Sequence, residues 1–124
     1  MSNAMSEEII RLVARFNDAL NHHDIDTMMQ YLTDDCVFEN TSPFPDGTRY
    51  EGQRAVRAFW EEFFRGAQKQ AIEIEEIFAC GNRGVMRWVY RWQGADAQSG
   101  HIRGVDIYSV RDGRIVEKMS YVKG

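Results

Sequence analysis

Residues 101–122, HIRGVDIYSVRDGRIVEKMSYV, decide the fold of this chain. Within them, the segments 101–110 and 115–122 alternate with a period of two, which is typical of β-strands that bury one face. The dipeptide Asp112-Gly113 between the two segments supplies the positive φ angles that a tight hairpin turn requires. The stretch therefore predicts an antiparallel β-hairpin.

The same period continues upstream of this hairpin. Residues 71–80 and 85–93 read as two further strands, separated by glycine-bearing turns, so the four strands together predict an antiparallel meander. Because side chains alternate between the two faces of a strand, every second residue lies on the same face. Two sets of residues therefore each share one face of their own strand. The first set is Met86, Trp88, Tyr90 and Trp92, and the second is Ile102, Gly104, Asp106 and Tyr108.

Upstream of Gly66 the apolar residues recur with the 3.6-residue period of helices. The predicted elements are a helix from the cap Ser6 to His22-His23, a short helix capped by Asp24 or Asp26 that ends at 33–35, a strand at 36–39, a loop at 40–52 and a helix at 52–64. This order predicts an α+β fold. We expect a cone-shaped α+β roll in which N-terminal helices pack on a curved, mainly antiparallel sheet.

Length and composition restrict the function. The chain has 124 residues, a formal charge of −4 and a pI near 5.3, which argues against binding to nucleic acid or to an anionic membrane. Residues 1–4 read as a remnant of cloning, so we expect a single domain over 5–124, and the lack of an apolar leader predicts a cytoplasmic protein. Cys36 and Cys80 are expected to be buried free thiols. No motif indicates a cofactor or a metal.

Asp106 is the candidate catalytic residue. Alternation along its strand does not decide whether its face is buried or exposed to solvent, so two interpretations stay open. If its face is buried, poor solvation favours a neutral carboxyl group that can donate a hydrogen bond to a ligand. If its face is wet, it is a surface aspartate paired with a nearby arginine. Gly104 favours a cavity, because a missing side chain in a strand often marks the close approach of another group.

Four stretches resemble the SnoaL-like family of the nuclear transport factor 2-like superfamily, which includes ketosteroid isomerases and polyketide cyclases. The stretches are Asp34–Glu39, Gly52–Trp60, His101–Tyr108 and Arg111–Val122, and the resemblance runs from Ser6 to the end of the chain. It implies the cystatin-like roll of that superfamily, a pocket for a small molecule and a homodimer. The sheet face that carries Val105 and Ile107, beside Arg87, Val89 and Arg91, is the candidate dimer surface.

When the catalytic residues of the ketosteroid isomerases are compared with this chain position by position, most of them are absent. The resemblance implies that the oxyanion tyrosine corresponds to Phe16, the general base to Asn40 and the two supporting tyrosines to Leu32 and Trp60, while Asp106 retains the acidic donor. Asn40 cannot accept the proton as a base must, which argues against steroid isomerisation by that mechanism. Limonene epoxide hydrolase relatives carry an arginine where Gly104 stands.

The functional hypothesis is therefore a cofactor-free isomerase, cyclase or hydrolase that acts on an apolar substrate containing a carbonyl group. Asp106 is its acid or base, and Asn40 orients the substrate oxygen. The predicted substrate-binding residues are Phe16, Phe38, Trp60, Met86, Trp88, Tyr90 and Tyr108. Two alternatives stay open: a binding domain for an apolar molecule without catalysis, and a structural dimerisation module whose aromatic side chains fill the cavity.

Overall fold

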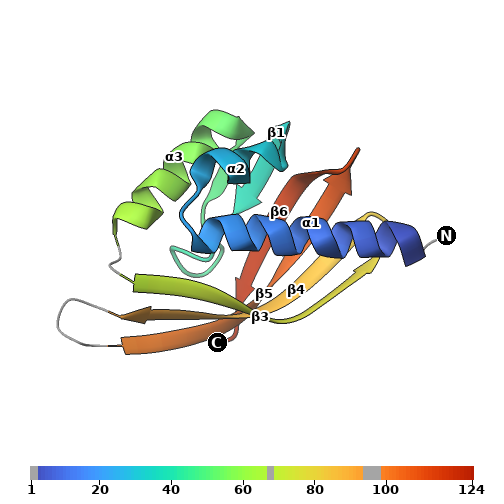
Figure 1. The fold of residues 1–124 in the computed structure, drawn as a ribbon. Coiled ribbons are helices and arrows are strands. Elements are labelled where there is room, and N and C mark those ends of the chain that lie inside the picture. The colour runs from blue at the N-terminus through green and yellow to red at the C-terminus, as the bar shows by residue number, and fades with distance from the viewer. Residues whose placement is uncertain (1–2, 67–68, 94–98) are drawn as a thin grey trace.

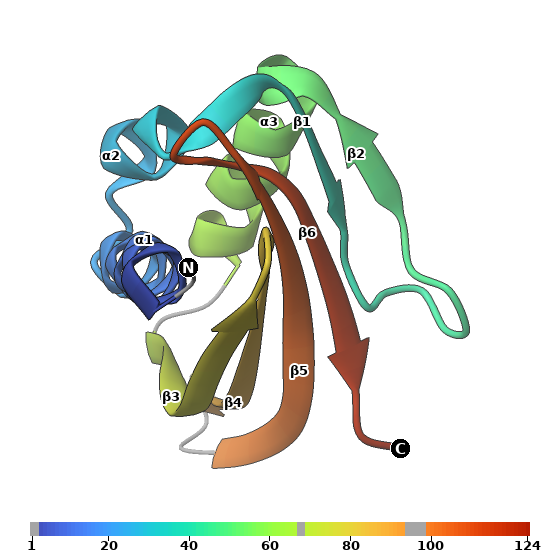
Figure 2. The same cartoon turned by 90° about the vertical axis from the view of Figure 1, so that its right-hand side faces the viewer.

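A computed structural model describes residues 3–66, 69–93 and 99–124. Three helices lie against one side of a six-stranded sheet, with the strands in the order β2-β1-β6-β5-β4-β3 (Figure 1). Figure 2 shows that the sheet curves around the helices, so its concave side faces them. The structure is the predicted α+β roll.

The helices begin and end close to the predicted positions, with two differences. They are α1 (Asn3–Asn21), α2 (Ile25–Gln30) and α3 (Gly52–Arg65). The prediction that Ser6 caps α1 is wrong: the helix begins earlier, and the Ser6 hydroxyl donates to the carbonyl of Ala79 at 3.4 Å. Asp24 caps α2, accepting from the backbone N–H of Thr27 at 3.2 Å. This helix ends before residues 33–35 because Leu32 already pairs with the last strand.

The strands are β1 (Leu32–Glu39), β2 (Arg49–Glu51), β3 (Lys69–Cys80), β4 (Arg83–Gln93), β5 (Ser99–Arg111) and β6 (Arg114–Val122). All neighbouring pairs are antiparallel except β1 and β6, which are parallel. The predicted hairpin turn is confirmed, since Asp112 and Gly113 have φ angles of 53° and 78°. Strand β2 lies within the segment predicted as a loop.

The core lies between α1, α3 and the concave side of the sheet. Val13 and Phe16 on α1 pack with Met86 on β4 and Tyr108 on β5, and all four side chains are almost fully buried. Cys36 is buried as predicted, and its burial raises the pKa of its thiol above the ordinary value. Cys80, in contrast, is exposed at the end of β3, which corrects the expectation that both thiols are buried.

A β-bulge in β3 decides which way its acidic residues point. The register between β3 and β4 shifts between Ile74 and Glu76, so Ile74 and Ile77 pair with residues of the concave face. The glutamates of this strand face outward, where they form ion pairs of 2.7–3.4 Å with arginines of β4 and β5: Glu73 with Arg91, Glu75 with Arg87 and Arg103, and Glu76 with Arg87. This network of ion pairs covers one part of the outer face of the sheet.

Candidate functional site

A pocket of about 390 Å³ opens between α3 and the concave side of the sheet, which is the size range of small-molecule sites. Its wall is mainly aromatic, because Phe59, Trp60 and Phe63 project from successive turns of α3 toward the strands. The Trp60 ring stacks on Phe38 of β1 with centroids 5.3 Å apart, and the Phe63 ring lies 5.9 Å from Tyr90 of β4. Aromatic contacts thus connect α3 to both halves of the sheet.

Asp106 lies at the base of this pocket and is only 3% exposed. Its Oδ1 accepts the indole N–H of Trp88 at 2.9 Å, and its Oδ2 accepts the hydroxyl of Tyr108 at 3.2 Å. The Nζ of Lys118 lies 3.2 Å from the same Oδ2. The face of Asp106 is therefore the buried one of the two that alternation along the strand left open, and its partner is the Lys118 ammonium group, not a surface arginine.

Lys118 is the unexpected member of the site, because lysine is rarely buried unless it is paired. Its Nζ donates to the Ser120 hydroxyl at 3.1 Å in addition to the contact with Asp106. The same atom lies 4.3 Å from the centroid of the Phe38 ring and 5.4 Å from that of Trp60, a geometry in which aromatic faces attract a cation. Two aromatic walls and one carboxylate thus hold the ammonium group at the pocket.

Tyr108, which donates to Asp106, and Tyr90 on the pocket wall keep their protons. Burial, the charge of Asp106 and the hydrogen bond to it raise the pKa of Tyr108 well above its ordinary value. Burial also raises the pKa of Tyr90 on the pocket wall. At neutral pH both are therefore neutral phenols, and Tyr108 acts only as a hydrogen-bond donor to Asp106.

Asn40 closes the end of β1 and lines the mouth of the pocket. Its Oδ1 accepts from the backbone N–H groups of Thr48 at 2.8 Å and Ser42 at 3.3 Å, which holds the loop to β2 in place. Gly47 allows this arrangement, because it has a φ of 74° and a Cβ there would collide with the Asn40 carbonyl. The amide oxygen is thus occupied by the loop, while the Nδ2 group has no hydrogen-bond acceptor among the described residues.

Helix α1 supports the opposite wall of the pocket through two asparagines. Asn17 and Asn21 each donate to the carbonyl of Ile72 on β3 at 2.9 Å, and the Ile72 N–H donates to Asn21 Oδ1 at 2.8 Å. Strand β3 is an edge strand, so these side chains bind backbone groups that no neighbouring strand pairs. Ile72, which lines the pocket, is thereby fixed to the helix layer.

The structure brings most of the predicted site residues together. The pocket is lined by Asn40 and Asp106 and by four of the predicted substrate-binding residues, Phe38, Trp60, Trp88 and Tyr90. Phe16, Met86 and Tyr108 lie behind this wall in the core, where the rings of Phe16 and Tyr108 meet edge to face with centroids 6.5 Å apart. Sequence reasoning missed Lys118 and Ser120 and, among the apolar lining, Tyr50, Phe59, Phe63, Ile72 and Ile102.

Gly104 has a role different from the one expected. It pairs with Trp88 across β4 and β5, and a Cβ built on it would lie 2.5 Å from Cζ2 of the Trp88 ring. The groups that approach this glycine are therefore the Trp88 indole and the backbone carbonyl of Tyr121, and not a ligand. With its ring seated over Gly104, Trp88 reaches the carboxylate of Asp106 two residues along the strand.

The described ranges contain neither a cluster of metal-ligating side chains nor a helix that could span a membrane. In residues 3–66, 69–93 and 99–124 no three His, Cys, Asp or Glu side chains are grouped so that they could hold a metal ion. No helix in this part of the chain has the length and apolar character needed to cross a membrane.

Comparison with known proteins agrees with the family resemblance of the sequence. The model of the SnoaL-like domain matches residues 13–118. The chain is 39% identical to a nuclear transport factor 2-like protein of unknown function from Mesorhizobium loti, with a TM-score of 0.79 over 96% of this chain and 93% of that one. No curated protein matches it.

Two further solved structures carry names that describe an activity. A Mycobacterium tuberculosis protein, described as an LEH-like epoxide hydrolase, is 25% identical with a TM-score of 0.80, over 95% of this chain and 84% of that one. A putative SnoaL-like polyketide cyclase from Shewanella denitrificans is 24% identical with a TM-score of 0.79, over 91% and 88% of the two chains. At 24% identity, the similarity to the cyclase shows only that the two chains share a fold.

Proposed function

Since the chain belongs to the SnoaL-like family of the nuclear transport factor 2-like superfamily, we propose that its pocket binds an apolar small molecule with a carbonyl group and that Asp106 acts on it as acid or base. One observation carries the proposal: a carboxylate that is 3% exposed lies at the base of an aromatic pocket of about 390 Å³. A structural module would have no need of this open volume, and its aromatic side chains would fill it.

The chemistry we propose needs no cofactor. Asp106 removes a proton from the carbon next to the carbonyl, the electrons of that C–H bond form a C=C bond, and the carbonyl π electrons move to the oxygen. The Asn40 Nδ2 group, at the same pocket, can donate to this oxygen. If the enolate is conjugated with a further C=C bond, return of the proton from Asp106 to the far carbon isomerises the molecule. If the enolate carbon instead attacks a second carbonyl, a ring closes and the resulting alkoxide takes the proton from Asp106. Hydrolysis is the remaining variant, in which Asp106 activates a water molecule.

A second candidate, binding without catalysis, is favoured by the contacts of Asp106. Three donors, from Trp88, Tyr108 and Lys118, already occupy its two oxygens. Hydrogen bonds to the ionised form weaken a carboxylate as a base. The two candidates therefore differ in whether Asp106 exchanges a proton with a bound molecule.

Proton exchange separates the candidates directly. The protein is incubated in D₂O with 2-tetralone, a bicyclic ketone with acidic α-protons, and loss of the α-proton signal is followed by ¹H NMR. We expect the wild-type protein to accelerate exchange about 100-fold or more over buffer, and Asp106→Asn to remove nearly all of this acceleration. The substitution keeps the shape of the side chain and an acceptor for Lys118.

Asp112→Asn is the matched control, because Asp112 is exposed at the tip of the β5–β6 turn and asparagine tolerates its positive φ. This variant should exchange at the wild-type rate. If Asp106→Asn also retains the wild-type rate, Asp106 is not the base. If 2-tetralone binds to the wild-type protein, as measured by quenching of tryptophan fluorescence, without accelerated exchange, the binding domain is the better description.

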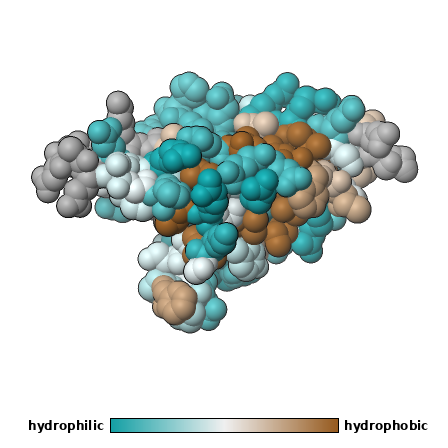
Figure 3. Space-filling model, turned by 90° about the horizontal axis from the view of Figure 1, so that it is seen from below, coloured by the Kyte–Doolittle hydropathy of each residue, from teal (hydrophilic) through white to brown (hydrophobic). Residues whose placement is uncertain are grey.

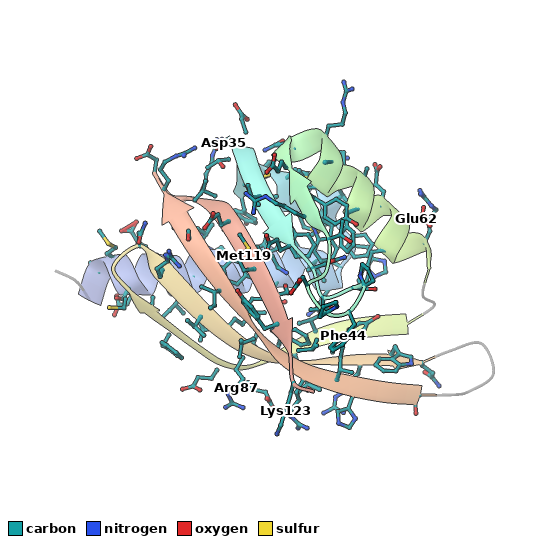
Figure 4. The ribbon with its side chains drawn as sticks, turned by 180° about the vertical axis from the view of Figure 1, so that it is seen from behind. Asp35, Phe44, Glu62, Arg87, Met119 and Lys123 are labelled. Atoms are coloured by element: carbon teal, nitrogen blue, oxygen red, sulfur yellow. The ribbon has the colours of Figure 1, made fainter. Side chains whose placement is uncertain are left out.

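We further propose that two copies of the chain associate through the outer face of the sheet. An apolar row crosses four strands there, Phe78, Val85, Ile107 and Met119, which are cross-strand neighbours in the register. Figure 4 shows Met119 on this side of β6, and Figure 3 shows hydrophobic surface in the middle of the face that is seen from below. Val89, expected in the same surface, is 1% exposed and so contributes little contact area.

Light scattering coupled to size-exclusion chromatography tests the dimer. We expect twice the mass of one chain for the wild-type protein and a single-chain mass for Ile107→Glu, because a charge in the centre of an apolar interface is left unpaired. Ala58→Glu adds the same charge on the exposed side of α3 and should remain dimeric. A wild-type monomer at every concentration, or an unchanged mass for Ile107→Glu, contradicts this interface.

A further inference from the structure

The polar groups around the pocket divide unequally into donors and acceptors. The acceptors are engaged within the protein: Asp106 receives Trp88, Tyr108 and Lys118 on its two oxygens, and Asn40 Oδ1 receives two backbone N–H groups. The Ser120 oxygen receives Lys118. The side chains around Lys118 thus have few free acceptors to offer to a bound molecule, and the hydroxyl groups of Thr41 and Ser42 line the pocket next to Asn40.

Donors, in contrast, remain available. An ammonium group has three N–H donors, and the described contacts of Lys118 Nζ use two, toward Asp106 and Ser120. Among the described residues, nothing accepts a hydrogen bond from the Asn40 Nδ2 group. The Ser120 oxygen accepts from Lys118, and its hydroxyl hydrogen can still be donated. All three residues line the pocket. Among them only Lys118 carries a charge, and charge-assisted hydrogen bonds are roughly twice as strong as neutral ones.

We infer that Lys118 binds the carbonyl oxygen of the ligand and that the pocket distinguishes ketones and quinones from the corresponding alcohols. This inference rests on the proposed function and adds to it a specificity residue and a substrate class. A carbonyl oxygen only accepts hydrogen bonds, so it suits a wall that offers donors. A hydroxyl group bound at Lys118 brings a donor of its own, which would be buried beside Phe38 and Trp60 with the nearby acceptors already engaged, and an unpaired buried donor is costly.

The position of Lys118 also suits this role in a reaction. Asp106 and the faces of Phe38 and Trp60 hold its ammonium group in place before any ligand arrives. A fixed cation at the point where an enolate oxygen gains charge stabilises that state without rearrangement. Lys118 therefore serves binding and turnover with the same contact, whereas Asn40 contributes a neutral donor at the mouth.

Three tricyclic ligands of one frame test the inference: fluorenone, fluorenol and fluorene, which present a carbonyl, a hydroxyl and no oxygen. Their dissociation constants are measured by quenching of tryptophan fluorescence, since Trp60 and Trp88 line the pocket. We expect fluorenone to bind about 10-fold or more tightly than either of the others. Infrared spectra should show the carbonyl stretch of bound fluorenone at lower wavenumber than in an apolar solvent, because it accepts a charged hydrogen bond.

Lys118→Gln should bring the dissociation constants of the three ligands to within about threefold of each other and move the carbonyl stretch back. Lys123→Gln is the matched control, because Lys123 is an exposed lysine beyond the end of β6, and it should keep the wild-type preference. The comparison of ligands on the wild-type protein stands even if Lys118→Gln fails to fold.

The outcomes separate the role of Lys118 from the binding of apolar molecules in the pocket. If the three ligands bind the wild-type protein equally, or if Lys118→Gln keeps the preference for fluorenone, the role of Lys118 is overturned while apolar binding in the pocket stands. If none of the three binds, the proposed function fails, and this inference fails with it.

Discussion

Replacing Lys118 with methionine is expected to lower the free energy of unfolding by about 3–5 kcal/mol. The change removes one member of a buried ion pair whose side chains are only 8% and 4% exposed. Methionine fills a similar volume but leaves the Asp106 carboxylate without a countercharge, and Trp88 and Tyr108 alone then compensate it. Urea unfolding followed by circular dichroism at neutral pH measures the loss.

The double variant Asp106→Asn, Lys118→Met separates the ion pair from the packing. It has no buried charge to leave unpaired, so we expect it to recover most of the stability that Lys118→Met loses. Lys123→Met, at an exposed lysine, should change the stability by no more than about 0.5 kcal/mol. If the single and double variants are equally destabilised, the loss comes from the packing around Phe38 and Trp60 and not from the charge of Asp106.

Parity along the strands was sufficient to identify one half of the site. Alternation predicted that Trp88 and Tyr90 share one face of β4 and that Asp106 and Tyr108 share one face of β5. The register between β4 and β5, which has no shift, places these two sets on the same side of the sheet. On α3 the helical period in the same way turned Trp60 toward the core, and Phe59 and Phe63 lie on the same apolar face although they were not predicted to line the pocket. In both cases the periodicity of the element itself determines where a side chain points, so the sequence is sufficient.

Lys118 could not be found in this way, because a β-bulge lies between the turn and the site. Counted outward from the Arg111–Arg114 pair, an unbroken hairpin would place Met119 opposite Asp106. The register shifts by one residue between Ser109 and Val110, so Ser120 pairs with Asp106 and Lys118 with Tyr108. A shift of one residue exchanges the faces of a strand. The sequence carries no signal for the bulge, and the charged member of the site was therefore missed.

Gly104→Ala is the second substitution with a large expected effect, and we expect it to lower the free energy of unfolding by about 3 kcal/mol. A Cβ at this position would lie 2.5 Å from Cζ2 of Trp88 and would also collide with the backbone carbonyl of Tyr121. The backbone of β6 can relieve the collision with Tyr121 only by disturbing its pairing with β5, and the indole has to move as well. Movement of the ring breaks the 2.9 Å hydrogen bond from Trp88 to Asp106.

Gly100→Ala is a matched control because it makes the same change at the other tryptophan–glycine pair of these strands. Gly100 faces Trp92, and its Cβ would also lie 2.5 Å from the indole ring. Trp92 is 37% exposed, however, so its ring can swing into solvent, and the cost should stay below about 1 kcal/mol. Near-ultraviolet circular dichroism should show a changed tryptophan environment in Gly104→Ala. Equal losses of stability in the two variants would mean that the burial of Trp88 and its bond to Asp106 add nothing to the steric cost.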